Sequence, residues 1–248
     1  MNILRGWMAL ALLLGIAQTV ASQKDSQPHP SPDRLAQAEK ERPGGGISRI
    51  SRLLAVQRAG QAHFLEISTR GLPVMGSAEA KVTMIEFSDY QCFFCRRHDR
   101  QVAPRIVEEY VETGRLKYVF ADFPLASHAG ASKAAQAAHC AGDQGKYWEM
   151  NDLLFRHPQS LTQGTLKAFG TSLELDNQAL LDCVESGKYA QKVRDGLNQG
   201  KRVGVRGTPS FFFGLTDKTQ PTIRVRKTLT GAHPYPAFQR LIEDLLAQ

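Results

Sequence analysis

Hydrophobic positions recur with two different periods along the chain, and these periods predict the order of its elements. Residues 82–87 are mostly apolar and rich in β-prone side chains, which is typical of a strand buried on both faces. Apolar positions from 102 to 110 then recur at helical spacing until Gly114, and residues 116–120 predict a second strand. Strand, helix and strand in this order predict a βαβ unit.

The pattern changes between residues 128 and 202. Alanine-rich amphipathic segments follow one another there, with predicted breaks at His157-Pro158, Gly164, Gly170 and Gly187. We therefore expect an all-helical insertion of about four or five helices. Strand patterns return at 210–213 and 223–229, joined as a hairpin, and residues 236–246 predict a closing helix.

The N-terminal segment has the composition of an export signal. Arg5 gives a positive start, residues 7–20 are apolar, and small residues lead up to Ala21. Together they predict a signal peptide over residues 1–21. A retained membrane anchor is the alternative, but the apolar run is shorter than the roughly 18 residues that a span needs.

The remaining chain divides by composition. Residues 22–46, rich in Pro, Ser, Gln and Gly, predict a flexible linker. Residues 47–70 predict an extension that holds a short amphipathic helix and a strand. The main domain then comprises residues 71–127, the helical insertion at 128–202 and a second half at 203–248.

Charge and cysteine content narrow the function classes. The formal net charge is +7, but the lysines and arginines are dispersed, with no run of five or more and no interleaved aromatic residues. This pattern predicts a solvated basic surface rather than a nucleic-acid site. The four cysteines are an even number, and export would place them where disulfides are permitted.

Cys92-Phe93-Phe94-Cys95 lies between the buried strand and the helical pattern. A first sulfur at a helix N-terminus is favoured as a thiolate by the helix dipole and by free backbone N–H groups, and the thiolate is the reactive form. The second thiol can then attack a mixed disulfide formed by the first, which makes a reversible two-electron redox unit. Half of a zinc site and a plain stabilising disulfide are the alternatives, although so small a loop stabilises little.

Three separate parts of the chain resemble the DsbA-like periplasmic thiol–disulfide oxidoreductases. Residues 86–95 resemble their active-site strand, residues 204–212 the loop that holds their cis-proline, and residues 138–141 with 144–148 their helical insertion. The resemblance covers residues 72–248. It implies an α/β architecture, a thioredoxin fold with an inserted all-helical subdomain, and a reaction that needs no metal or organic cofactor.

Spacing and resemblance together assign the reacting groups. Cys92 is the predicted nucleophile and Cys95 the resolving thiol, because the first sulfur lies at the open end of the helix. By resemblance, Glu86 lies beneath the pair and relays protons to or from Cys95; an edge position with its carboxylate in water is the alternative. By the same resemblance the Thr208-Pro209 bond is cis and the Thr208 backbone pairs with an extended substrate, whereas the alternative is an ordinary trans proline.

Phe93 and Phe94 are assigned to substrate contact together with Thr208 and Pro209. Neither phenylalanine can donate a hydrogen bond to a thiolate, and Phe94 stands where strongly oxidising members of the resembled family usually carry a histidine. The dipole contributes at most about 2 kcal/mol, so we expect a Cys92 pKa on the order of 7 before local hydrogen bonds are counted, and a less extreme oxidant. His98 is expected to be a surface residue rather than a catalytic base.

Cys140 and Cys183 fall in different predicted helices of the insertion. A bond between them would close a loop of about 44 residues and stabilise the fold by up to about 4 kcal/mol. We therefore expect a structural disulfide. A zinc site would need all four cysteines to converge, and this second pair lacks the short spacing that is typical of zinc ligands.

These observations predict thiol–disulfide exchange on exported proteins with cysteine pairs, in a periplasm or a secreted location. A membrane redox partner is expected, with no nucleic acid and no stable membrane insertion after signal cleavage. The amphipathic helix at 47–56 is too short for a dimerisation domain of the isomerase type, which favours an oxidase. A disulfide isomerase or reductase, and a copper- or zinc-handling chaperone that uses the two thiols as ligands, are the alternatives.

Overall fold

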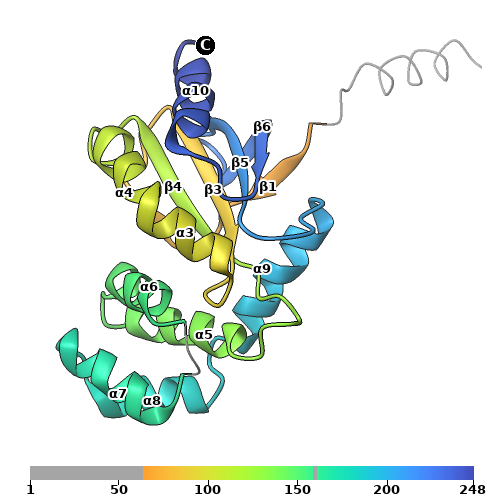
Figure 1. Cartoon of the computed structure of the whole chain (residues 1–248). Helices are drawn as coiled ribbons and strands as arrows, with labels where there is room; N and C mark the ends of the chain where they lie inside the picture. The colour runs from red at the N-terminus through yellow and green to blue at the C-terminus, as the bar shows by residue number, and fades with distance from the viewer. Residues whose placement is uncertain (1–63, 159–160) are drawn as a thin grey trace, which may run out of the picture. The chain divides into compact units, whose positions relative to one another are not determined.

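A mixed sheet of six strands organises the part of the chain that the computed structural model describes, residues 64–158 and 161–248 (Figure 1). Its strand order is β1-β6-β5-β3-β4-β2. β3 and β4 are parallel, and every other neighbouring pair is antiparallel. The strands are β1 (Glu66–Ser68), β2 (Val74–Met75), β3 (Val82–Ser88), β4 (Leu116–Asp122), β5 (Ser210–Thr216) and β6 (Thr222–Thr230).

Most of the N-terminal predictions lie outside the described residues. The signal peptide at 1–21, the linker at 22–46 and the helix at 47–56 therefore stay predictions. The strand expected within the 47–70 extension is found as β1, which pairs with β6. β2 was not predicted, because a strand of two residues has no alternation to detect.

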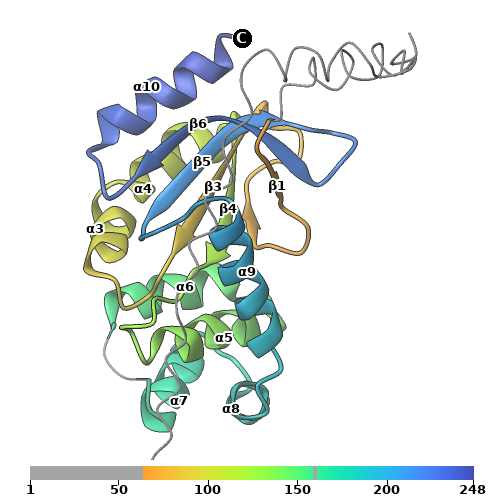
Figure 2. The ribbon, with the colours of Figure 1, turned by 90° about the vertical axis from the view of Figure 1, so that its right-hand side faces the viewer.

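Helices cover both faces of the sheet (Figure 2). α3 (Phe93–Gln101), α4 (Ala103–Ile106), one π-helical turn η1 (Val107–Val111) and α10 (Tyr235–Leu246) pack on one face. α9 (Ala190–Arg202) packs on the other face, where Leu197 contacts the apolar side chains of β3 and β4. No helix within residues 64–158 and 161–248 has both the length and the apolarity to cross a membrane.

The helix predicted between the redox cysteines and Gly114 is interrupted at Val102. Val102 leaves the helical conformation, with φ −123°, and α4 begins immediately after it. Pro104 explains the interruption, because it has no N–H to donate to the carbonyl of Arg100 and its ring clashes with that carbonyl. The first helix therefore ends less than two turns after Cys95.

The inserted helices share an apolar cluster with Tyr90, Phe120 and the two cysteines at the start of α3, and they confirm the predicted helical insertion. α5 (Ala131–Gly142), α6 (Tyr147–Arg156), α7 (Gln163–Ser172) and α8 (Asn177–Glu185) surround it. The breaks predicted at Gly164 and Gly170 are wrong, since both residues lie within α7. Gly170 is required for packing instead, because a Cβ there would come within 2.2 Å of Asn177 Oδ1.

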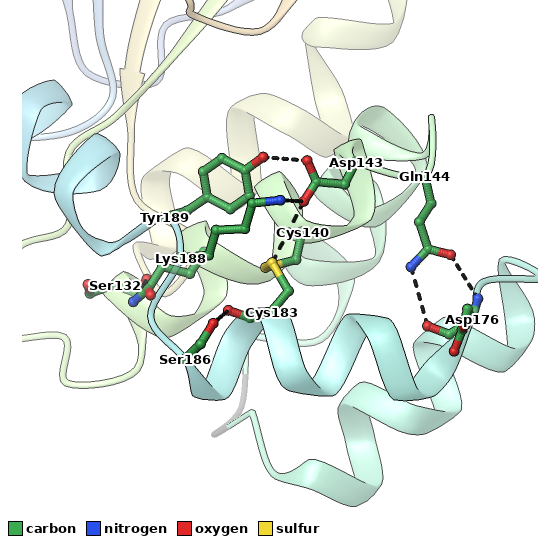
Figure 3. The surroundings of a disulfide bond; sticks show 10 residues. Ser132, Cys140, Asp143, Gln144, Asp176, Cys183, Ser186, Lys188 and Tyr189 are labelled. Carbon is green, nitrogen blue, oxygen red and sulfur yellow. Dashed lines mark hydrogen bonds and ion pairs between the residues drawn. A yellow bond between two sulfur atoms is a disulfide. The ribbon is translucent and has the colours of Figure 1, made fainter.

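A disulfide joins α5 to α8 between Cys140 and Cys183, with 5.9 Å between their Cα atoms (Figure 3). Beside it, the Asp143 carboxylate accepts hydrogen bonds from Lys188 Nζ at 2.8 Å and from the Tyr189 hydroxyl. Asp143 thus holds the turn after α8 against the end of α5, next to the disulfide.

Candidate active site

Cys92 is the N-cap residue of α3, at the point where the chain leaves β3. Its carbonyl accepts the first helical hydrogen bond, from Arg96 N at 3.1 Å. Its side chain is 6% exposed, whereas Cys95, one turn further into α3, is fully buried. Both are free thiols in this structure, so the described form is the dithiol.

The surroundings of Cys92 lower its pKa to about 5. The largest contribution is a hydrogen bond between the two thiols, in which Cys95 donates to the Cys92 thiolate. Thr208 and the backbone N–H groups of Cys95 and Phe94 lower the pKa further. The pKa near 7 expected from the helix dipole alone is therefore too high, because that argument left these donors out.

Cys95 is shifted in the opposite direction. Burial raises the pKa of its thiol well above the ordinary value, and the Cys92 thiolate and the Glu86 carboxylate raise it further. At neutral pH the reduced pair therefore consists of a Cys92 thiolate and a protonated Cys95. This division makes Cys92 the more reactive of the two sulfurs.

The loop before β5 faces the cysteine pair. Its Thr208–Pro209 peptide bond is cis. The Cys92 thiol donates a hydrogen bond of 3.4 Å to the Thr208 carbonyl oxygen, across 116 positions of sequence. Thr208 and Cys92 therefore lie in contact, and a substrate sulfur bound to Cys92 would meet the backbone of this loop.

Glu86 lies in β3, between β4 and β5, and is 2% exposed, so the edge position that was the alternative does not apply. Side chains alternate along a strand, which places Glu86 on the same face as Val82 and Met84, the face covered by α3. Burial raises the pKa of Glu86 to about 7, although the Tyr118 hydroxyl donates a hydrogen bond to its carboxylate. A group with this pKa can take up or release a proton at physiological pH.

His98 is fully buried, and the expectation of a surface residue is wrong. Its ring packs against Phe211 and Phe238, with centroid distances of 4.5 and 4.9 Å. Burial lowers the pKa of His98 to about 3, so the ring is neutral and its 3.7 Å contact with Glu86 is not an ion pair. The sequence held a signal for this burial, because His98 shares a helical stripe with Cys95 and Val102.

Asp89 fixes the loop between β3 and α3, a role that the sequence reasoning missed. One oxygen of its buried carboxylate accepts from the backbone N–H groups of Gln91, at 2.7 Å, and Cys92, at 3.1 Å. The other accepts from Leu125 N at 2.7 Å and lies 3.0 Å from His128 Nδ1. An aspartate directly after a strand is typical of such a turn, which was the available signal.

Gln91 connects the same loop to the helical insertion. Its amide oxygen accepts from Gly130 N at 2.8 Å, and its amide nitrogen donates to the Pro158 carbonyl at 3.2 Å. Gly130 has no space for a Cβ, because that atom would lie 2.8 Å from the Gln91 amide nitrogen. The position of Cys92 thus depends on contacts with two inserted segments.

Phe93 and Phe94 are exposed on the first turn of α3, where their rings meet edge to face with centroids 5.6 Å apart. Their exposed fractions are 59% and 49%, which are high for aromatic side chains. The guanidinium of Arg96 lies 5.6 Å from the Phe93 ring centroid, and that of Arg97 lies 5.1 Å from the Phe94 centroid. The surface around the reactive sulfur is therefore both aromatic and cationic.

The described residues contain no group of three or more His, Cys, Asp or Glu side chains that could hold a metal ion. The described residues bring four groups together. A thiolate-forming cysteine lies at a helix N-terminus beside a buried partner thiol. A buried carboxyl group lies beneath the two thiols, and a cis-proline loop lies in front of them. This set of groups, on a mixed sheet covered by helices, defines a two-thiol redox site of the thioredoxin class.

Comparison with known proteins agrees with that class. The family model described as Thioredoxin matches residues 68–244, and the chain belongs to the thioredoxin family. Among solved structures, BdbD from Bacillus subtilis superposes with a TM-score of 0.64 at 22% identity, over 75% of this chain and 98% of that one. Alpha-DsbA1 from Wolbachia pipientis gives 0.62 at 24% identity, over 73% and 94%. The prediction of a DsbA-like thioredoxin fold is confirmed.

Curated relatives are similar over a little more than half of the chain. The Na(+)/H(+) antiporter NhaA 1 of Salinispora arenicola is 34% identical over 140 residues, which are 56% of this chain and 21% of that protein. The probable disulfide bond formation protein D of Bacillus anthracis is 27% identical over 146 residues, which are 56% of this chain and 67% of that protein. The chain thus spans about a fifth of the antiporter relative.

Proposed function

We propose that the protein is a DsbA-like thiol–disulfide oxidoreductase that forms disulfides in exported proteins. The observation that carries the proposal is the opposite shift of the two sulfurs, a Cys92 pKa near 5 beside a Cys95 pKa far above the ordinary value. A stable Cys92 thiolate makes Cys92 a good leaving group and stabilises the reduced protein. The corresponding disulfide is therefore a strong oxidant.

The reaction starts from the Cys92–Cys95 disulfide. A substrate thiolate attacks Cys92 Sγ, the bond between Cys92 and Cys95 breaks, and Cys95 leaves as a thiolate that takes up a proton. Glu86, whose pKa is near 7, supplies that proton from beneath the pair. A second substrate thiolate then attacks the substrate sulfur of the mixed disulfide and releases the Cys92 thiolate, so that two electrons pass to the protein.

Substrate contact is assigned to four residues around the sulfur. The Thr208 backbone, next to Pro209, lies against Cys92 and can pair with an extended segment. Phe93 and Phe94 offer exposed rings to apolar side chains of the same segment. The export signal predicted at residues 1–21 supports a periplasmic or secreted location, where a membrane redox partner would reoxidise the reduced pair.

The reduction potential of the Cys92–Cys95 pair tests the direction of electron flow. We expect a value above that of thioredoxin, about −270 mV, and below that of the strongest oxidants of this class, about −120 mV, measured by equilibration with glutathione. A value near about −270 mV would contradict the oxidase and support a reductase. Stoichiometric metal retained by the reduced protein without peptide oxidation would support the metal-handling alternative instead.

A less extreme oxidant than the histidine-bearing members stays a prediction. The lowered Cys92 pKa shows only that hydrogen bonds can replace a missing histidine in stabilising the thiolate. The same potential measurement, made on Phe94→His beside the parent protein, ranks the two arrangements directly. An unchanged potential in Phe94→His would contradict the predicted role of this position.

A further inference from the structure

A surface hollow runs along α3 from the redox site towards the loop before α10. Its first part, of about 450 Å³, is lined by Phe93, Arg96, Arg97, Arg100 and Gln101. A second part, of about 290 Å³, shares Arg97 and Gln101 with the first and extends to the residues before α10, Ala232, His233 and Pro234. The hollow begins at the residue that follows the nucleophilic cysteine in sequence.

The charge of this hollow has one sign. Arg96, Arg97 and Arg100 contribute the formally charged side chains that line it, and no carboxylate is among its lining residues. Within residues 64–158 and 161–248, none of the three arginines forms an ion pair. The acidic residue of α3, Asp99, lies instead in a separate cavity that also borders Glu86. The three cations are therefore free to bind an external anion.

The arginines are held in place rather than left to move independently. Arg97 donates a hydrogen bond of 2.7 Å to the Ala232 carbonyl while its guanidinium lies over the Phe94 ring. Arg96 lies over the Phe93 ring in the same way. Such stacking orders a long side chain, so less entropy is lost when it binds a carboxylate.

Arg96 and Arg97 also disfavour the helix that carries them. Both lie in the N-terminal half of α3, whose first turn contains no acidic residue, and positive charge there opposes the helix dipole. Positive charge near a helix N-terminus that no ion pair balances makes the helix less stable. Such unfavourable placements are typical of functional positions. The hydrogen bond and ring contacts orient the two guanidinium groups but leave their charge unbalanced.

We propose that this arginine-lined hollow selects substrate segments that carry carboxylates within a few residues of the cysteine that reacts with Cys92. The proposal rests on the proposed function and deepens it, since it specifies the chemistry of the substrate. A segment bound to Cys92 and paired with Thr208 must pass Phe93, and its neighbouring side chains then reach the arginines. Acidic side chains complement the charge there, and the exposed rings accept apolar ones.

The test compares three dithiol peptides that differ only in the residues flanking the cysteines, which are aspartate, serine or lysine. The oxidised full-length protein is mixed with each peptide, and the second-order rate constant is measured at low salt and at roughly 0.5 M salt. We expect the aspartate peptide to react about 10-fold faster than the lysine peptide at low salt, and high salt to reduce this ratio towards one.

The decisive variant is Arg96→Gln, Arg97→Gln and Arg100→Gln combined, which should bring the aspartate-to-lysine ratio close to one. A control triple, Lys167→Gln, Lys201→Gln and Arg226→Gln, removes the same charge from exposed positions on α7, α9 and β6 and should keep the ratio. Because the measured quantity is a ratio between peptides, a general change in thiol reactivity or in folded fraction cancels.

Each outcome distinguishes the inference from the proposed function. Equal rate constants for all three peptides would overturn the inference and leave the oxidase intact, whereas no oxidation of any peptide would overturn the oxidase. Loss of the ratio in the control triple would show that net charge alone is responsible and would also overturn the inference. Co-sedimentation with vesicles of anionic phospholipid, lost in the arginine triple and accompanied by equal peptide rates, would assign the hollow to a membrane surface instead.

Discussion

The two cysteine pairs of this chain carry the same chemical groups in opposite circumstances. Cys92 and Cys95 lie one turn apart at the start of α3 and are free thiols, whereas Cys140 and Cys183, 43 positions apart, are joined between two inserted helices. Hydrogen-bond donors and a buried carboxyl group surround the first pair. The second pair is bonded and connects distant parts of the chain. Surroundings and loop length therefore decide which pair reacts and which stabilises.

The largest difference between the two cysteine pairs should appear when the predicted nucleophile, Cys92, is removed. Cys92→Ser should lower the rate of dithiol-peptide oxidation by at least about 1,000-fold, because no other sulfur can form the mixed disulfide. Measured at about pH 4, where Cys92 is largely protonated in both the folded and the unfolded protein, the free energy of unfolding of the reduced protein should change by less than about 1 kcal/mol, since the pair is not bonded in that form. Peptide kinetics and urea unfolding check both parts, and peptide oxidation within 10-fold of the parent would contradict the assignment.

The matching change in the second pair should affect stability instead. Cys140→Ala with Cys183→Ala should lower the free energy of unfolding by about 4 kcal/mol, because the unfolded chain is no longer constrained by a long loop. The folded variant should oxidise peptides at the parent rate. Urea unfolding and the same kinetic assay measure these effects. An undiminished stability, or a slow but fully folded variant, would show that the two pairs are not separate in role.

A smaller effect concerns the carboxyl group beneath the first pair. The folded-state pKa of Glu86, about 7, lies above its ordinary 4.5, so the folded protein binds more protons between these values and loses stability as pH rises through them. Glu86→Gln should therefore gain stability relative to the parent, by roughly 3 kcal/mol between pH 4.5 and about 8. Urea unfolding across that range measures the gain.

The buried histidine beside Glu86, His98, changes the pH dependence of stability in the opposite direction. The pKa of His98 is lowered to about 3, so its contribution to stability is lost as pH falls below 6.5. His98 contributes in the same way to Glu86→Gln and to the parent protein. Its contribution therefore cancels when the two free energies of unfolding are subtracted. Glu112→Gln, at an exposed carboxylate, is the matched control and should follow the parent. A pH-independent difference for Glu86→Gln would mean that Glu86 is already ionised in the folded protein.

The spacing of hydrophobic residues along the chain was enough to predict most of the strands and helices that position the active site. A β-prone apolar run before Cys92 and the helical pattern after it predicted β3 and α3, because both depend on neighbours in sequence. The cis-proline loop and the helical insertion came from resemblance, and periodicity alone would not have placed them opposite the thiols. Pro104 was visible in the sequence and predicts the break after α3, but the periodicity across it obscured that signal.

What the sequence could not provide is contact between distant residues. The Cys92 pKa depends on the partner thiol, on Thr208 and on backbone donors brought together by folding, whereas the helix dipole is local and was therefore the only contribution that could be estimated. The same holds for Asp89, whose second carboxylate oxygen meets a loop more than thirty residues further along the chain. The helical spacing of residues could have predicted that His98 is buried. Its neutral state could not be predicted, because it depends on neighbours that only folding brings together.

The hydrogen bonds of Asp89 and Gln91 set a limit on protein engineering. Both side chains use partners in the helical insertion or in the segment leading to it, at Leu125, His128, Gly130 and the Pro158 carbonyl. A transplant of residues 89–95 into a thioredoxin-fold scaffold that lacks these segments would leave one oxygen of the buried Asp89 carboxylate without donors and the Gln91 amide without its partners, at a cost of about 1–3 kcal/mol each. The redox motif of this chain therefore cannot be transplanted alone. The smallest segment that can be moved with its contacts intact includes the helical insertion.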